Sequence, residues 1–160
     1  MFGQEELWRY REGNRLEFKE AQGGLPRSFW ETYSSFANTQ GGLIVLGAAE
    51  KSDGTMRAIG IANLEALRRD LWGGLNNEQK VSTNLLLDSD ITQESIDGKS
   101  LLLVYVPRAD RTLRPVYIND NPKRGSFRRN GDGDYHCTAE ELRAMARDSA
   151  EGATDKLVLT

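Results

Sequence analysis

The sequence predicts an α/β fold of the α+β type, in which two or three helices pack on one mixed β-sheet within a single domain. Three observations support this fold class. Residues 15–20 alternate apolar and charged side chains, as a half-buried strand does. Residues 43–47 form a continuous apolar run, which is typical of a central strand covered on both faces. Between them, aromatic side chains recur at helical spacing and predict a helix with a core-facing stripe: Phe29, Trp30, Tyr33 and Phe36.

Individual residues in the first strand and the helix that follows it support these assignments. In the first strand, Leu16 and Phe18 are expected to face inward and the charged residues between and after them outward. The helix is expected to begin near Pro26, because proline suits a first helical turn. Residues 38–42 end it, with Gly41 or Gly42 able to adopt the left-handed cap.

The next elements are a return strand at residues 57–61 and a second helix. Asn63 is the expected N-cap of that helix. Its apolar stripe comprises Leu64, Leu67, Leu71 and Leu75. Strands are then expected at residues 90–96 and 101–106, joined by the turn-forming pair Asp97 and Gly98.

The last elements are two short strands and a helix. The strands are predicted at residues 115–118 and 126–129. Thr138 and Glu141 form a capping box that opens a final helix running through Met145. Composition becomes linker-like after Ser149, so the domain is predicted at residues 1–149, and residues 150–160 as a tail or linker to a missing downstream region.

Composition limits the classes of protein. The 160 residues lack an N-terminal signal peptide and any apolar stretch long enough to span a bilayer, so we expect a soluble, cytoplasmic protein with no membrane partner. Cys137 is the one cysteine, which excludes an intramolecular disulfide and a four-cysteine zinc site. His136 lacks the partners of a catalytic dyad, and a structural role is expected for it.

Charge is unevenly distributed. The net charge is −3, which argues against a nucleic-acid binder, yet residues 105–130 hold seven Arg and Lys against two Asp, a net +5. Such a segment is compatible with a local phosphate-binding face and equally with solvated arginines.

Several ordered motifs resemble the Schlafen AlbA-like domain family. They span roughly residues 10–148 and comprise Glu12 with residues 16–19, then residues 36–47, 59–61, 114–117, 127–131 and 138–142. The resemblance implies a DNA-binding domain, of the kind that stands at the N-terminus of bacterial transcriptional regulators with an ATPase-like or winged-helix region downstream. The partner expected from it is DNA or RNA, with no cofactor, and a homodimer stays open.

The candidate contacts are cations that can neutralise backbone phosphates. They are Lys19, Arg27, Arg124, Arg128 and Arg129. Arg27 follows a glycine-containing loop at a helix N-terminus, where free N–H groups favour an anion. Because neighbouring strand residues point to opposite faces, only one of Arg128 and Arg129 can join a single flat patch with Arg124. The alternative for these arginines is pairing with acids of the domain.

Two other functions remain open. Some Schlafen relatives are RNA-cleaving enzymes that hold a divalent metal, here Mg²⁺ or Mn²⁺, with three carboxylates. The resemblance assigns these positions to Glu12, Glu17 and Glu50, but Ala49 stands where the first acid of the family's acidic pair would be, so the triad is incomplete. The remaining alternative is a structural or self-association module of a larger regulator. Residues 38–42 match the family, and we expect their role to be architectural.

Overall fold

A four-stranded mixed sheet forms the centre of the computed structural model, which describes residues 3–159. The strands lie in the order β1-β2-β6-β5, with β1 parallel to β2 and the other neighbours antiparallel. Their bounds are Leu16–Lys19 for β1, Gly42–Leu46 for β2, Ile91–Ile96 for β5 and Lys99–Val106 for β6. The predicted α+β class is confirmed.

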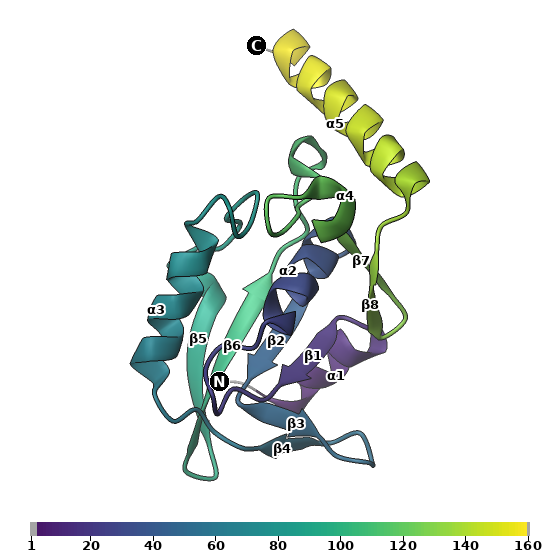
Figure 1. Cartoon of the computed structure of the whole chain (residues 1–160). Coiled ribbons are helices and arrows are strands. Elements are labelled where there is room, and N and C mark those ends of the chain that lie inside the picture. Colours follow the sequence, from purple (N-terminus) through teal and green to yellow (C-terminus); the bar gives the residue numbers. More distant parts are fainter. Residues whose placement is uncertain (1–2, 160) are drawn as a thin grey trace.

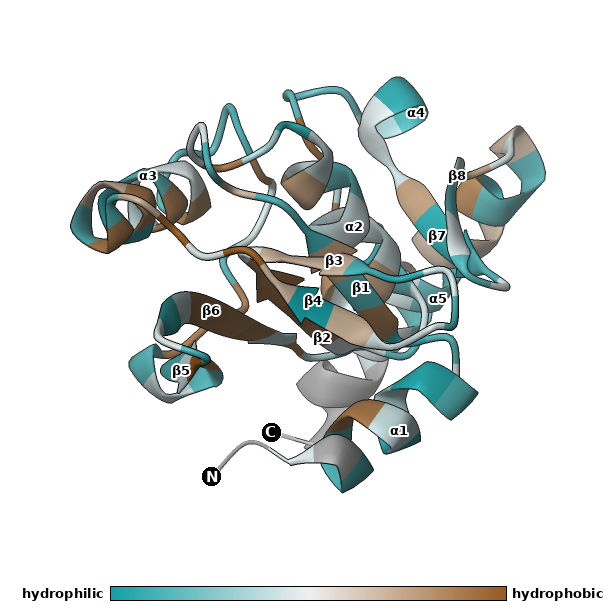
Figure 2. Cartoon of the chain, turned by 90° about the horizontal axis from the view of Figure 1, so that it is seen from below, coloured by the Kyte–Doolittle hydropathy of each residue, from teal (hydrophilic) through white to brown (hydrophobic). Residues whose placement is uncertain are grey.

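Five α-helices accompany the sheet in the described residues. They are α1 (Gln4–Glu12), α2 (Ser28–Asn38), α3 (Leu64–Leu75), α4 (Pro122–Gly125) and α5 (Ala139–Leu159). Figure 1 shows their arrangement along the chain, and Figure 2 shows α2 and α3 on one side of the sheet and α1 on the other. Two or three helices were expected, and the additional ones are α1, to which the sequence pattern assigned no element, and the single turn α4.

Each face of the sheet has its own apolar cluster, as the alternation along β2 shows. Ile44 and Leu46 join the larger cluster formed with α2 and α3. Leu43 and Val45 join a smaller one with side chains of α1 and β1. All four side chains are fully buried. The prediction of a central strand covered on both faces is therefore confirmed.

The aromatic stripe of α2 lies in the core as predicted. Phe29, Tyr33 and Phe36 are fully buried and Trp30 is 5% exposed. The helix ends where Gly41, at φ +73°, donates its N–H to the carbonyl of Phe36 at 2.7 Å. A Cβ on Gly42 would lie 2.6 Å from the Phe36 ring, so a glycine is also needed where the chain enters β2.

Other local predictions are confirmed. The Asn63 side chain accepts from the N–H of Ala66 at 3.0 Å and caps α3. Asp97 and Gly98 both have positive φ in the β5–β6 turn, as a two-residue hairpin requires. Thr138 and Glu141 make both bonds of the capping box that opens α5.

Two strand predictions have different outcomes. The return strand predicted at residues 57–61 is present but shorter: β4 (Met56–Ala58) pairs antiparallel with β3 (Ala48–Glu50) in a hairpin that is separate from the main sheet and follows Gly47, whose φ is +94°. Residues 115–118 form only isolated bridges, Tyr117 with Ser126 and Ile118 with Val81. Their backbone bonds go largely to side chains rather than to a neighbouring strand.

The final helix is much longer than predicted. It continues past Met145 to Leu159, through residues whose composition suggested a linker. It is held beside the 3₁₀ turn η2 (Arg111–Leu113), where the Ser149 hydroxyl donates to the carbonyl of Thr112 at 3.0 Å. None of the helices in residues 3–159 has the length and apolarity needed to cross a membrane.

Candidate nucleic-acid interface

A hairpin of β7 (Phe127–Asn130) and β8 (Gly133–His136) packs against α2 and carries two of the predicted contacts. Asn38 at the end of α2 positions it. The Asn38 amide donates to the carbonyls of Val116 and Phe127, both at 2.9 Å, and accepts from the N–H of Val116 at 2.7 Å. The architectural role predicted for residues 38–42 is confirmed at Asn38, whose partners lie in distant segments of the chain.

The inner face of this hairpin presents Arg129 to β1. Its guanidinium lies 3.0 Å from Glu17 and 2.9 Å from Asp134, and its side chain is 5% exposed. It also donates to the carbonyls of Asn14 and Leu16, at 2.8 and 3.2 Å. Four of the five guanidinium N–H groups of Arg129 are bonded within the domain, so this residue is engaged in holding the hairpin to the sheet.

The outer face presents Arg128. Its Nε donates to Glu141 of α5 at 2.8 Å, and its guanidinium carbon lies 5.8 Å from the ring centre of Tyr135. The side chain of Arg128 is 27% exposed. As the strand period predicts, Arg128 and Arg129 point to opposite sides.

A second group of cations surrounds the first turn of α2. The ammonium group of Lys19, which the strand alternation places on the same side of β1 as Glu17, donates to the Ser28 hydroxyl at 3.0 Å. Arg27 is exposed and shares a hollow of about 310 Å³ with Lys80, whose ammonium lies 5.6 Å above the Trp30 ring. Asp70 also lines this hollow. We call Lys19, Arg27 and Lys80 the α2 cation group; within residues 3–159 none of the three is in an ion pair.

The solvent exposure of the charged face of β1 is thus lower than predicted. Glu17 and Lys19 were expected to meet water, but both are half-buried because the β7–β8 hairpin and the start of α2 lie over that face. Their partners are Arg129 and Ser28.

The remaining cations of residues 105–130 do not form one free surface. Arg111 and Arg114 both approach Asp148 of α5, at 3.4 and 3.6 Å. Arg124 is exposed on α4, and its backbone N–H donates to the side chain of Asn121, which caps that turn. With Arg128 and Arg129, four of the seven cations are therefore paired with acids from other elements.

The three carboxylates of the nuclease alternative do not converge. Glu17 and Glu50 line a common hollow of about 310 Å³ with Asp132, but Glu12 is exposed at the end of α1 and is not part of its lining. Glu17 is bonded to Arg129, and Glu50 lies 3.6 Å from Arg11. Across the described part of the chain, no three acids, histidines or cysteines are grouped closely enough to hold a metal ion. These residues do not fit a divalent cation as they stand.

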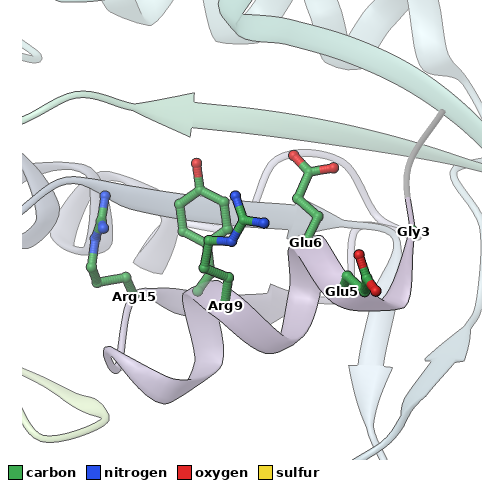
Figure 3. Close-up of a pocket in the computed structure, with 6 residues that line it drawn as sticks. Gly3, Glu5, Glu6, Arg9 and Arg15 are labelled. Carbon is green, nitrogen blue, oxygen red and sulfur yellow. The ribbon is translucent and has the colours of Figure 1, made fainter.

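A further hollow, of about 420 Å³, lies beside α1 (Figure 3). Glu5, Glu6, Arg9 and Arg15 bring charges of both signs to it. Glu6 accepts from the hydroxyl of Tyr105 at 2.5 Å, and burial together with this carboxylate raises the pKa of Tyr105. The mixed charge does not favour an anion such as phosphate at this hollow.

Two candidate site residues were not predicted from the sequence. Lys80 lies in the polar connection after α3, and its approach to Arg27 depends on how α3 packs against α2. Tyr135 is 53% exposed on the outer face of β8, a strand that was not predicted. His136 is exposed and its ring contacts that of Phe127, with ring centres 4.4 Å apart.

Comparisons with known proteins bear on these features. The family model described as "Schlafen, AlbA_2" matches residues 12–138. A solution structure of the N-terminal domain of a protein related to the ATP-dependent DNA helicase RecG, from Nitrosomonas europaea, is similar at 30% identity and a TM-score of 0.58, covering 84% of this chain and 90% of that one. No curated protein sequence matches this chain significantly.

A crystal structure of the DIP2311 protein from Corynebacterium diphtheriae shows the same fold at 22% identity and a TM-score of 0.57. The similarity covers 85% of this chain but only 24% of that protein. The family match spans most of the 160 residues, and the Nitrosomonas domain is matched over nearly its whole length. This chain belongs to the Schlafen AlbA_2 family, which is related to nucleic acids.

Proposed function

We propose that this chain is a nucleic-acid-binding domain, with DNA as its ligand, that contacts mainly backbone phosphates through the α2 cation group. The observation that carries the proposal is that Arg27 and Lys80 line one hollow beside Trp30 while Lys19 bonds Ser28 in the same first turn of α2. In the described residues no acid is paired to any of the three. The dipole of α2 adds positive potential at the same place. The name of the Nitrosomonas relative, which refers to a DNA helicase, favours DNA over RNA.

Arg124 and Arg128 remain in the proposed contact set as outer residues. Arg124 is exposed on α4, whereas Arg128 would have to share its guanidinium with Glu141. Arg129 is left out, because a phosphate could reach it only by displacing Glu17 and Asp134 from a nearly inaccessible side chain.

The test is the salt dependence of binding. Anisotropy of a labelled duplex and a labelled single strand is titrated with the protein at several salt concentrations. Each phosphate neutralised on duplex contributes about −0.9 to the slope of log K against log salt. Changing Lys19, Arg27 and Lys80 together to Gln should weaken binding at low salt and flatten the slope by up to about 2.7 for three contacts.

A matched control removes the same charge elsewhere. Lys51, Arg57 and Arg69 are exposed cations on the β3–β4 hairpin and on α3. Changing these three to Gln should leave the slope close to that of the wild type. Equal losses in the two triple variants, or wild-type binding that is absent at low salt or flat across the range, would refute the α2 cation group as the interface.

A metal-dependent ribonuclease is the second candidate. Its one support is that Glu17 and Glu50 line a common hollow, although their pairing with Arg129 and Arg11 does not fit a divalent cation. The test is decay of structured RNA in the presence of Mn²⁺ or Mg²⁺, comparing wild type with Glu17→Gln. Identical decay would eliminate it.

We also propose that the domain is the N-terminal module of a transcriptional regulator, with an ATPase-like or winged-helix region downstream. The alternative function is self-association within a larger regulator. A concentration-dependent dimer in sedimentation, without affinity for any nucleic acid, would favour a self-association module instead.

A further inference from the structure

Tyr135 is an exposed aromatic residue whose ring lies next to Gly133. It lies directly opposite Arg128 in the β7–β8 register, and the two side chains share the outer face of the hairpin. A Cβ built on Gly133 would lie 2.9 Å from one ring carbon of Tyr135 and 3.1 Å from its hydroxyl oxygen. The backbone of Gly133 does not have a positive φ, so the turn does not require a glycine there, and a side chain at this position would displace the exposed Tyr135 ring.

The hairpin beneath this ring is held by hydrogen bonds to neighbouring elements. Asp134, the preceding residue, accepts from the Thr32 hydroxyl of α2 at 2.6 Å and from Arg129 at 2.9 Å. Arg128 is in turn held by Glu141 at 2.8 Å. Because these bonds already hold the hairpin and Arg128, stacking of a base on Tyr135 would mainly have to fix the tyrosine side chain itself.

The hairpin that carries Tyr135 is bonded to the helix that the α2 cation group surrounds, with Asp134 on the inner face of the hairpin and Tyr135 on its outer face. Thr32, which bonds the residue next to Tyr135, lies one helical turn after Ser28, which bonds Lys19. A chain of contacts through a single turn of α2 therefore connects the hairpin to the proposed phosphate contacts.

We propose that Tyr135 is a stacking platform for an unpaired base, so that the preferred ligand is single-stranded nucleic acid. The aromatic ring is a π-surface on which any base can stack, and the guanidinium of Arg128, which lies over one face at 5.8 Å from the ring centre, supplies a positive charge next to the strand. Bases in a duplex are stacked on one another and are not free to reach such a ring. The inference rests on the proposed function, because it presupposes that the chain binds nucleic acid.

The experiment compares three labelled probes of equal length: a pyrimidine single strand, the same strand with abasic sites in place of bases, and a duplex. Tyr135→Ala should weaken binding of the pyrimidine strand by at least about fivefold, the lower end of what one stacked base contributes. It should leave binding of the abasic strand within about twofold of wild type, because the phosphates are unchanged. Tyr135→Phe keeps the ring and should bind all three probes as wild type does.

A second variant tests whether the position of the Tyr135 ring next to Gly133 matters for binding. Gly133→Ala adds a methyl group where the ring now lies and should reproduce the selective loss on the pyrimidine strand. Thermal melting of each variant checks that the exposed substitution has left the fold intact.

The outcomes separate the two proposals. Wild-type affinity of Tyr135→Ala for the pyrimidine strand, or an equal loss on the abasic strand, overturns the stacking platform while salt-dependent binding by the wild type still supports the proposed function. Absence of salt-dependent binding to all three probes overturns both.

Discussion

The inner and outer faces of the β7–β8 hairpin carry adjacent arginines in opposite circumstances. Arg129, with a side chain 5% exposed, joins two carboxylates and two backbone carbonyls. Arg128, 27% exposed, joins one carboxylate and rests near an exposed tyrosine ring. The difference teaches that the strand period, and not the local density of charge, decides which cation builds the fold and which one is available to a ligand.

Substitution of each arginine tests this difference most directly. Arg129→Met should reduce the free energy of unfolding by about 3–5 kcal/mol, because it leaves Glu17 and Asp134 partly buried without their cation. Arg128→Met should reduce it by less than about 1 kcal/mol, the usual contribution of a solvated ion pair. Urea denaturation measures both. Arg129→Lys, which keeps the charge but loses the planar fork, should fall between them. Similar losses in the two Met variants would contradict the distinction.

A second change tests how the inner face is held to α2. Asn38→Ala should destabilise the protein by about 1–3 kcal/mol, because it removes partners from buried backbone groups of Val116 and Phe127. Hydrogen exchange should show faster opening of the Val116 amide, which donates to Asn38 in the wild type.

The matched control for Asn38 is Asp at the same position. Asn38→Asp keeps an acceptor for the Val116 N–H but replaces the donor amide with a buried acceptor, so it should be at least as destabilising as Ala. A variant as stable as the wild type would mean that these backbone groups find other partners.

Local structure was predictable from the sequence wherever neighbouring residues determine it. The Asn63 cap, the Asp97–Gly98 turn and the Thr138 capping box depend on side chains within a few residues of the backbone groups that they satisfy. The continuation of α5 was not predictable in this way. Its residues 150–159 look like a linker, but Gly152 allows the helix to lie within contact distance of Arg111 and Thr112.

The candidate site was predictable only in part, because pairing of charges is a long-range property. The sequence identified Lys19 and Arg27 but could not reveal that Lys80, which follows α3, shares a hollow with Arg27. It also could not reveal that Glu17, 112 positions earlier, neutralises Arg129. Counting cations in a segment therefore overestimates the free charge, since the acids that pair with them come from elsewhere in the chain.

The smallest expected effect concerns Glu141, which links the outer face to α5. Burial raises the pKa of its carboxyl group, but hydrogen bonds from Thr138 and Arg128 outweigh that effect and lower the pKa below the usual 4.5. Because the folded pKa is depressed, the stabilisation is complete above the unfolded pKa and is lost as pH falls through the folded value. Urea denaturation of wild type and Glu141→Gln should therefore show a constant difference in stability near neutral pH that shrinks below about pH 4.5.

The same Glu141→Gln comparison in the Arg128→Met variant separates the contribution of Arg128 from that of Thr138. In that background the charge-assisted bond to Glu141 is absent, so the stability difference between Glu141 and Gln should be smaller at neutral pH and should depend less on pH. Thr138 still donates its N–H to the same carboxylate at 2.8 Å, so a residual dependence is expected from the capping box alone. A pH dependence unchanged by the loss of Arg128 would show that the outer arginine does not hold Glu141, and the contrast with Arg129 would then rest on burial and not on pairing.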